Sequence, residues 1–109
     1  MKRALFIYNP FSGNRIVPRE LDRIIEKFQE NDIFLDVYRT TEDHRGLKEV
    51  LMRTDIDLII GAGGDGTIGI IANEIIRQNI KIPYGTLGTG TCNNFTNNID
   101  IPNDLEKAI

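Results

Sequence analysis

The sequence contains little of what several classes of protein need. It has one cysteine, Cys92, and one histidine, His44, so an internal disulfide and the usual Cys and His spacings of zinc sites are both excluded. No apolar run approaches the ~18 residues of a membrane-spanning helix, and the run at residues 4–8 is too short for a signal peptide. A net charge of −3 argues against a general nucleic-acid-binding surface. The expectation is a cytoplasmic globular protein.

The chain does contain a regular alternation of two hydrophobic periods. Its 109 residues fit one domain. Short apolar, β-branched runs predict four strands, at residues 4–8, 33–39, 57–60 and 84–87. Apolar residues at helical spacing predict three helices between the strands, with buried faces made of Leu21, Ile24, Ile25 and Phe28, then Leu47, Val50 and Leu51, then Ile68, Ile71, Ala72, Ile75 and Ile76. A last helical pattern begins at Leu105.

This βαβαβαβα order predicts an α/β fold, a three-layer α/β/α arrangement around a mostly parallel sheet. We expect the strand order 2-1-3-4. Pro18 is expected to open the first helix, and residues 40–43 offer N-cap candidates for the second. Phe6, Phe28, Phe34 and Tyr38 are expected in the core.

A glycine-rich stretch, residues 61–67, connects the third predicted strand to the third predicted helix. At such a turn unpaired backbone N–H groups point outward, and the helix dipole favours an anion. Gly63, Gly64 and Gly66 lack a Cβ, so the backbone can lie close to a phosphate. The stretch therefore indicates a phosphorylated ligand. The alternative is a tight turn with nothing bound.

Asp65 stands among these glycines. A carboxylate beside a phosphate is unfavourable by itself, so it suggests a nearby Mg²⁺ ion or the waters of that ion. Alternatively, Asp65 or Thr67 caps the following helix. The two roles are compatible.

Two other loops with glycines and small polar residues also follow strands, at residues 9–13 and 88–94. In an open α/β sheet, ligands bind outside the carboxyl ends of the strands, near the point where strand order reverses. The order 2-1-3-4 would bring residues 9–13 and 61–67 side by side, with 88–94 as a neighbour. We therefore expect three loops to converge on one ligand.

Three motifs, at residues 9–13 (NPFSG), 63–67 (GGDGT) and 90–95 (GTCNNF), resemble in order and spacing the catalytic domain of diacylglycerol and sphingosine kinases. The resemblance implies that residues 1–109 are the N-terminal, nucleotide-binding lobe, with a fold like that of NAD kinases. The C-terminal β-rich lobe, which would supply the lipid pocket and the general base, is absent. The implied reaction transfers the γ-phosphate of ATP, with Mg²⁺, to a lipid hydroxyl such as that of diacylglycerol, in phospholipid biosynthesis. Peripheral membrane contact is expected only through the absent lobe.

The resemblance also assigns residues. Asp65 is the acidic residue on which activity depends, and a candidate Mg²⁺ contact through water. The positions that match nucleotide-binding residues are Asn9, Ser12, Gly13, Thr40, Gly63, Gly64, Asp65, Gly66, Thr67, Gly90, Thr91 and Asn93. Outside these motifs, Arg39, Arg45 and Arg53 could reach a phosphate, although charged side chains usually just face water.

The chain departs from the family pattern at four positions. Gly69 and Ile70 stand where the family has Asn and Glu, Asn94 replaces an aspartate, and Gly88 replaces a proline. The loss of two carboxylates removes negative charge that could organise Mg²⁺. Two alternatives therefore stay open: a lobe of an NAD kinase-like enzyme, which would share residues 63–67, and a non-catalytic nucleotide-binding or regulatory module. The chain alone is expected to bind nucleotide weakly and to transfer no phosphate.

Overall fold

The computed structural model describes residues 1–11, 15–41 and 43–88. The elements in chain order are β1 (Lys2–Tyr8), α1 (Ile16–Glu30), β2 (Ile33–Arg39), α2 (Leu47–Leu51), β3 (Leu58–Gly63), α3 (Asp65–Arg77) and β4 (Tyr84–Gly88). The helix expected from Leu105 lies outside the described residues. Within them, none of the helices combines the length and the apolarity needed to cross a membrane.

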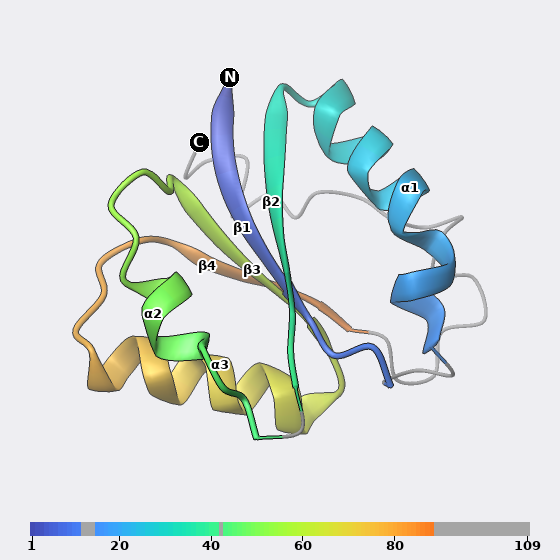
Figure 1. Cartoon of the computed structure of the whole chain (residues 1–109). Coiled ribbons are helices and arrows are strands. Elements are labelled where there is room, and N and C mark those ends of the chain that lie inside the picture. Colours follow the sequence, from blue (N-terminus) through green and yellow to red (C-terminus); the bar gives the residue numbers. More distant parts are fainter. Residues whose placement is uncertain (12–14, 42, 89–109) are drawn as a thin grey trace.

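The four strands form one sheet in the order β2-β1-β3-β4, and all three neighbouring pairs are parallel. The predicted order is confirmed. Figure 1 shows α1 on one side of the sheet and α2 and α3 on the other, which makes three layers. Because the strands are parallel, the carboxyl ends of all four lie at one edge, and the described segments that follow β1, β2 and β3 leave the sheet there.

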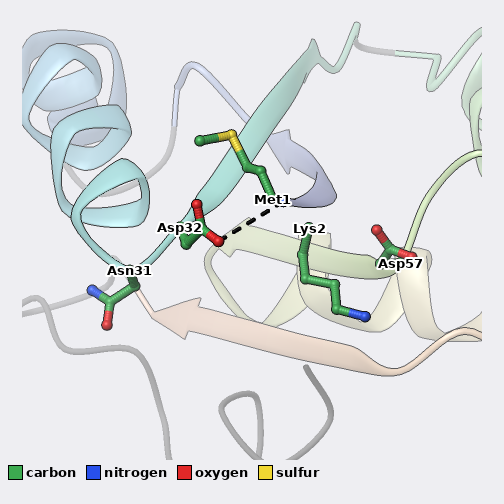
Figure 2. A pocket seen from close by; sticks show the side chains of 5 residues that line it. All are labelled: Met1, Lys2, Asn31, Asp32 and Asp57. Carbon is green, nitrogen blue, oxygen red and sulfur yellow. Dashed lines mark ion pairs between the residues drawn. The ribbon is translucent and has the colours of Figure 1, made fainter.

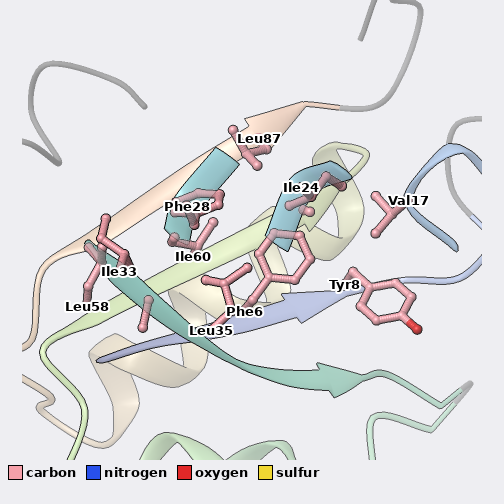
Figure 3. Packing of buried hydrophobic residues seen from close by; sticks show 12 residues of the cluster. Phe6, Tyr8, Val17, Ile24, Phe28, Ile33, Leu35, Leu58, Ile60 and Leu87 are labelled. Carbon is pink, nitrogen blue, oxygen red and sulfur yellow. The ribbon is translucent and has the colours of Figure 1, made fainter. Parts of the chain in front are cut away.

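The side chains of β1 divide between two clusters because successive residues of a strand point to opposite faces. Phe6 and Tyr8 lie on the α1 side, where Phe6 meets Phe28 with ring centroids 6.4 Å apart (Figure 3). Leu5 and Ile7 lie on the side of α2 and α3. β3 is buried along its whole length, as expected of a strand covered on both faces.

Several element boundaries differ from the sequence-based expectation: β1 begins two residues earlier, at Lys2, and β4 ends one residue later, at Gly88. β3 continues through Gly63, so the first part of the predicted turn is strand. There Ala62 pairs with Tyr8 on one side and with Leu87 on the other, and hydrogen bonds to both neighbours outweigh the low strand propensity of glycine. α1 begins at Ile16, ahead of Pro18.

Three local predictions were wrong. The N-cap of α2 is Gly46, without a side-chain cap, because the Thr41 hydroxyl instead accepts the backbone N–H of Arg45 at 3.1 Å. Phe34 is 42% exposed because β2 is an edge strand of the described sheet, and there the ring lies under the Arg3 guanidinium. Ile76 is 76% exposed, since α3 turns Ile71 toward the sheet instead.

Candidate functional site at the carboxyl edge of the sheet

The segments after β1 and β3 meet at the carboxyl edge. Asn9 Nδ2 donates a hydrogen bond to Thr67 Oγ1 at 3.1 Å, and the backbone N–H of Asn9 donates to the Ala62 carbonyl at 3.3 Å. Asn9 Oδ1 accepts the N–H of Phe11 at 2.9 Å, which turns the chain after β1. Thr67 is 6% exposed, and its hydroxyl oxygen accepts this hydrogen bond. The structure thus brings two of the three predicted loops together.

Residues 63–67 form the transition from β3 into α3. Gly63 has φ 155°, a backbone conformation that favours glycine. Gly64 is the N-cap of α3, and its carbonyl accepts the N–H of Ile68 at 3.1 Å. No side chain caps this helix, so capping does not account for Asp65 or Thr67. Asp65 is exposed in the first turn, where backbone N–H groups of an α-helix have no intrahelical partner.

Open space surrounds Gly64 and Gly66. A Cβ added at either position would meet no atom within 4 Å, and Gly64 has an ordinary φ of −79°. Packing within the described protein therefore gives no reason for glycine at these two positions. Glycine inside a helix costs up to about 1 kcal/mol relative to alanine. The arrangement leaves room for a ligand that approaches the backbone closely.

Thr40 lies directly after β2, beside the end of β1. Its backbone N–H donates to the Tyr8 carbonyl at 2.9 Å, and the residue is 2% exposed. Thr40 thus joins Asn9 and residues 63–67 at the same edge. The predicted site residues Ser12, Gly13, Gly90, Thr91 and Asn93 lie outside the described residues, as does Asn94.

One aromatic and two basic side chains form a group near this edge, and of these only Arg39 was a candidate from the sequence. The Phe11 ring is 59% exposed and has the guanidinium carbons of Arg15 and Arg39 at 5.5 and 5.9 Å from its centroid. The signal in the sequence was weak: Arg15 follows the loop at residues 9–13, and Arg39 ends β2. These side chains place positive charge near the carboxyl edge of the sheet.

Arg53, by contrast, is committed elsewhere. It pairs with Asp36 at 2.8 Å and with Asp55 at 2.7 Å, and hydrogen bonds from Arg53 hold the pKa of Asp55 below its usual range. Asp36 also pairs with Arg3 of β1 at 3.2 Å. Arg53 therefore serves a surface ion-pair network and is excluded as a phosphate contact.

A pocket at the opposite edge of the sheet does not belong to the candidate site. Its lining residues precede the strands: Met1 and Lys2 at β1, Asn31 and Asp32 before β2, and Asp57 before β3 (Figure 2). The Met1 amino group pairs with Asp32 at 3.8 Å across it. In parallel α/β sheets ligands bind at the carboxyl edge, and this pocket lies at the amino edge.

The donor set at the carboxyl edge limits how a metal could be held. Among residues 1–11, 15–41 and 43–88, no three or more His, Cys, Asp or Glu side chains are grouped as a metal site requires. Mg²⁺ commonly binds through one or two carboxylates together with phosphates and water. Asp65, exposed next to an open backbone surface, fits that mode and no other.

Comparisons with known proteins agree with one another. The sequence profile of the family described as "Diacylglycerol kinase catalytic domain" matches residues 3–109. Diacylglycerol kinase of Bacillus subtilis (strain 168) is 37% identical over 112 residues, which cover 99% of this chain and 37% of that protein. Diacylglycerol kinase of Staphylococcus aureus (strain JH9) is 34% identical, with 99% and 35% covered.

Solved structures give the same result. The crystal structure of a diacylglycerol kinase from Bacillus anthracis (strain Sterne) matches with a TM-score of 0.67 and 27% identity, covering 98% of this chain and 40% of that one. The chain thus spans less than half the length of these relatives. Its fold, its sequence and the position of its glycine loop place it in the same family: the chain belongs to the diacylglycerol kinase catalytic domain family.

Proposed function

We propose that this chain is the ATP-binding lobe of a lipid kinase that transfers the γ-phosphate of ATP to a hydroxyl of a lipid such as diacylglycerol. The kinase family supports the reaction class. The observation that carries the nucleotide assignment is the open backbone surface at Gly64 and Gly66, which packing among the described residues does not require. A phosphate chain lying against that backbone explains both glycines.

The proposed roles follow from the geometry. The N–H groups of the first turn of α3 bind phosphate oxygens, and the helix dipole adds to that attraction. Asn9 holds the Thr67 side chain at 3.1 Å, which fixes the first turn against the end of β1. Arg15 and Arg39 supply positive charge beside it. Phosphoryl transfer depends mostly on positioning and electrostatic stabilisation, which such a surface can provide.

Mg²⁺ would be held by Asp65, through water, together with the phosphates of ATP, and it would neutralise charge on the transferring group. Asp65 lies in the first turn of α3 and is exposed. Its position lets it face a metal–phosphate complex without a second carboxylate from the described residues.

The remaining parts of the reaction are assigned to a second lobe. The chain covers 37% of one bacterial relative and 35% of another, so most of each relative's length lies beyond the matched region. We place the lipid pocket and the general base in that remainder. The enzyme is proposed to be cytoplasmic, and any peripheral contact with a membrane is placed in the same remainder.

The test uses a longer protein that carries this chain, with ATP, Mg²⁺ and diacylglycerol in mixed micelles. Asp65→Asn is expected to lower kcat/KM by about 10- to 100-fold, the usual loss when an outer contact of a metal is removed. Asp55→Asn is the matched control, because that carboxylate pairs with Arg53 away from the candidate site, and its activity should be unchanged. Full activity of Asp65→Asn would contradict the proposal.

A non-catalytic nucleotide-binding module is the second candidate, and α3 favours it. Ile70 is 38% exposed on the helix that carries Asp65, and Gly69 has open space around it among the described residues. Gly69→Asn, Ile70→Glu and Asn94→Asp, combined in the longer protein, would restore the family pattern. A large gain of kinase activity from near zero would show that the natural protein has lost catalysis.

The family match favours the lipid kinase over an NAD kinase, and a substrate panel with NAD and diacylglycerol separates those two.

A further inference from the structure

Tyr84, the first residue of β4, makes a contact that none of the motifs explains. Its Oη donates a hydrogen bond to the Ile68 carbonyl at 3.0 Å. Ile68 lies in the first turn of α3, directly after Thr67. A side chain of the sheet therefore holds the backbone of the turn in which the proposed phosphate-binding N–H groups lie.

Gly61 makes this contact possible. Tyr84 pairs with Ile59 in the parallel ladder, and Gly61 lies two residues further along β3 on the same face. A Cβ at Gly61 would lie 2.7 Å from Tyr84 Oη and 3.0 Å from Ile71 Cδ1. The first distance is shorter than real Cβ atoms show and the second is tight, so a larger residue at position 61 would force the end of the Tyr84 ring to shift. The phenol reaches α3 only because position 61 is glycine.

The first turn of α3 is thereby held from two sides. Asn9, after β1, binds the Thr67 hydroxyl, and Tyr84, on β4, binds the Ile68 carbonyl. The ring itself packs with the cluster that includes Ile59 and Ile71, so its position is fixed by the core. Two anchors on neighbouring residues restrict both the rotation and the shift of the turn relative to the sheet.

We infer that Tyr84 and Gly61 act as a pair that positions the first turn of α3 for phosphate binding, so that Tyr84 is a positioning residue for the nucleotide. The inference rests on the proposed function, because it assumes that this turn binds the phosphates of ATP. Tyr84 does not touch the ligand. It acts through the direction in which the N–H groups of residues 65–67 point.

The main variant is Tyr84→Phe, which keeps the ring and removes only the hydroxyl. We expect the affinity of the chain for ATP to fall about threefold to tenfold, the usual effect of one neutral hydrogen bond. Inorganic triphosphate should lose affinity by the same factor, because the variant disturbs the phosphate-binding turn only. Binding is measured by calorimetric titration at a temperature at which circular dichroism shows every variant to be folded.

Tyr38→Phe is the matched control. Tyr38 Oη also donates to a backbone carbonyl, that of Arg45, but it does so before α2 and not at α3. Both variants should lower the melting temperature to a similar small extent, whereas only Tyr84→Phe should weaken ATP binding. A purely structural role for Tyr84 would weaken binding equally in both variants or in neither.

A double-variant cycle tests the pair itself. Gly61→Ala should weaken ATP binding more than Tyr84→Phe does, because the added Cβ displaces the ring. In the Tyr84→Leu background, which has no Oη to meet, Gly61→Ala should cost much less affinity. Unchanged affinity in Tyr84→Phe would overturn this inference alone. A wild-type chain that binds neither ATP nor triphosphate would overturn the proposed function, and the inference with it.

Discussion

Gly66 and Gly69 offer a direct comparison at the scale of single residues. Both lie in α3, and a Cβ at either position would meet no atom within 4 Å. They differ in position: Gly66 is in the first turn, beside Asp65 and Thr67, whereas Gly69 follows that turn. Only Gly66 lies where a bound phosphate would approach the backbone. Replacing either glycine with alanine should therefore change the stability in the same way, whereas ATP binding should change at position 66 only.

Gly66→Ala and Gly69→Ala should each raise the free energy of unfolding, by up to about 1 kcal/mol, because alanine is the better helix former and has room. Only Gly66→Ala should weaken ATP binding. Urea denaturation and calorimetric titration of both variants check this. Equal affinity of the two variants for ATP would contradict the phosphate-binding role of Gly66.

Tyr84 also gives the protein a dependence on alkaline pH. Burial raises the pKa of Tyr84 to about 12, from an ordinary value of 10.0. Since the folded state holds the proton more tightly, this contribution to stability is complete below pH 10 and is lost as the pH rises from about 10 to about 12. The difference in free energy of unfolding between wild type and Tyr84→Phe should shrink over that interval. A constant difference would mean that the phenol is not buried as described.

At the scale of elements, α3 is the part that joins the site to the core. Ile71 is fully buried and packs in the cluster that holds α2 and α3 against the sheet. Ile76, one and a half turns further, is 76% exposed. The packing of Ile71 against the sheet therefore fixes the direction of α3, and with it the direction of the N–H groups at its start. The exposed face of α3 that carries Ile76 does not contribute.

Ile71→Ala should lower the free energy of unfolding by about 2–5 kcal/mol, the usual cost of truncating a buried isoleucine. Ile76→Ala, in the same helix, should change it by less than about 0.5 kcal/mol because that side chain is in solvent. Chemical denaturation followed by circular dichroism measures both. A large loss for Ile76→Ala would indicate that α3 is rotated relative to this structure.

At the scale of the whole molecule, the described sheet presents its candidate residues at one edge only. Asn9, Thr40 and residues 63–67 gather there, whereas the pocket at the amino edge and the Arg53 network lie away from it. The described candidate site has one exposed carboxylate, Asp65, and that residue is assigned to Mg²⁺. We therefore expect the general base of the proposed kinase to lie outside the described residues, in the proposed second lobe.

The chain of 109 residues should accordingly bind ATP weakly and transfer no phosphate to diacylglycerol. A longer protein that carries this chain should bind ATP and also phosphorylate diacylglycerol. Calorimetric titration and a lipid phosphorylation assay with labelled ATP measure the two properties on each protein. Turnover by the short chain at a rate typical of kinases, about 1–100 s⁻¹, would refute the division into two lobes.

The sequence by itself determined the order of the elements, the parallel sheet and the place of the glycine loop. These follow from local periodicity, and parallel strands joined by helices have few arrangements open to them. The strand at residues 33–39 was even predicted to the residue, because its β-branched and aromatic residues are bounded by turn signals on both sides.

Only the tertiary structure decided how far β3 runs, that Phe34 and Ile76 face solvent, and that Tyr84 crosses Gly61 to reach Ile68. Each depends on residues distant in the sequence. Ala62 pairs with β1 and β4 and Gly63 pairs with β4, Phe34 lies on an edge strand, and Tyr84 needs a glycine at position 61. The contact between Asn9 and Thr67 is of the same kind, since it joins residues that no local pattern relates. Local sequence sets the period of burial, but the packing of neighbouring strands and helices sets which side chains meet.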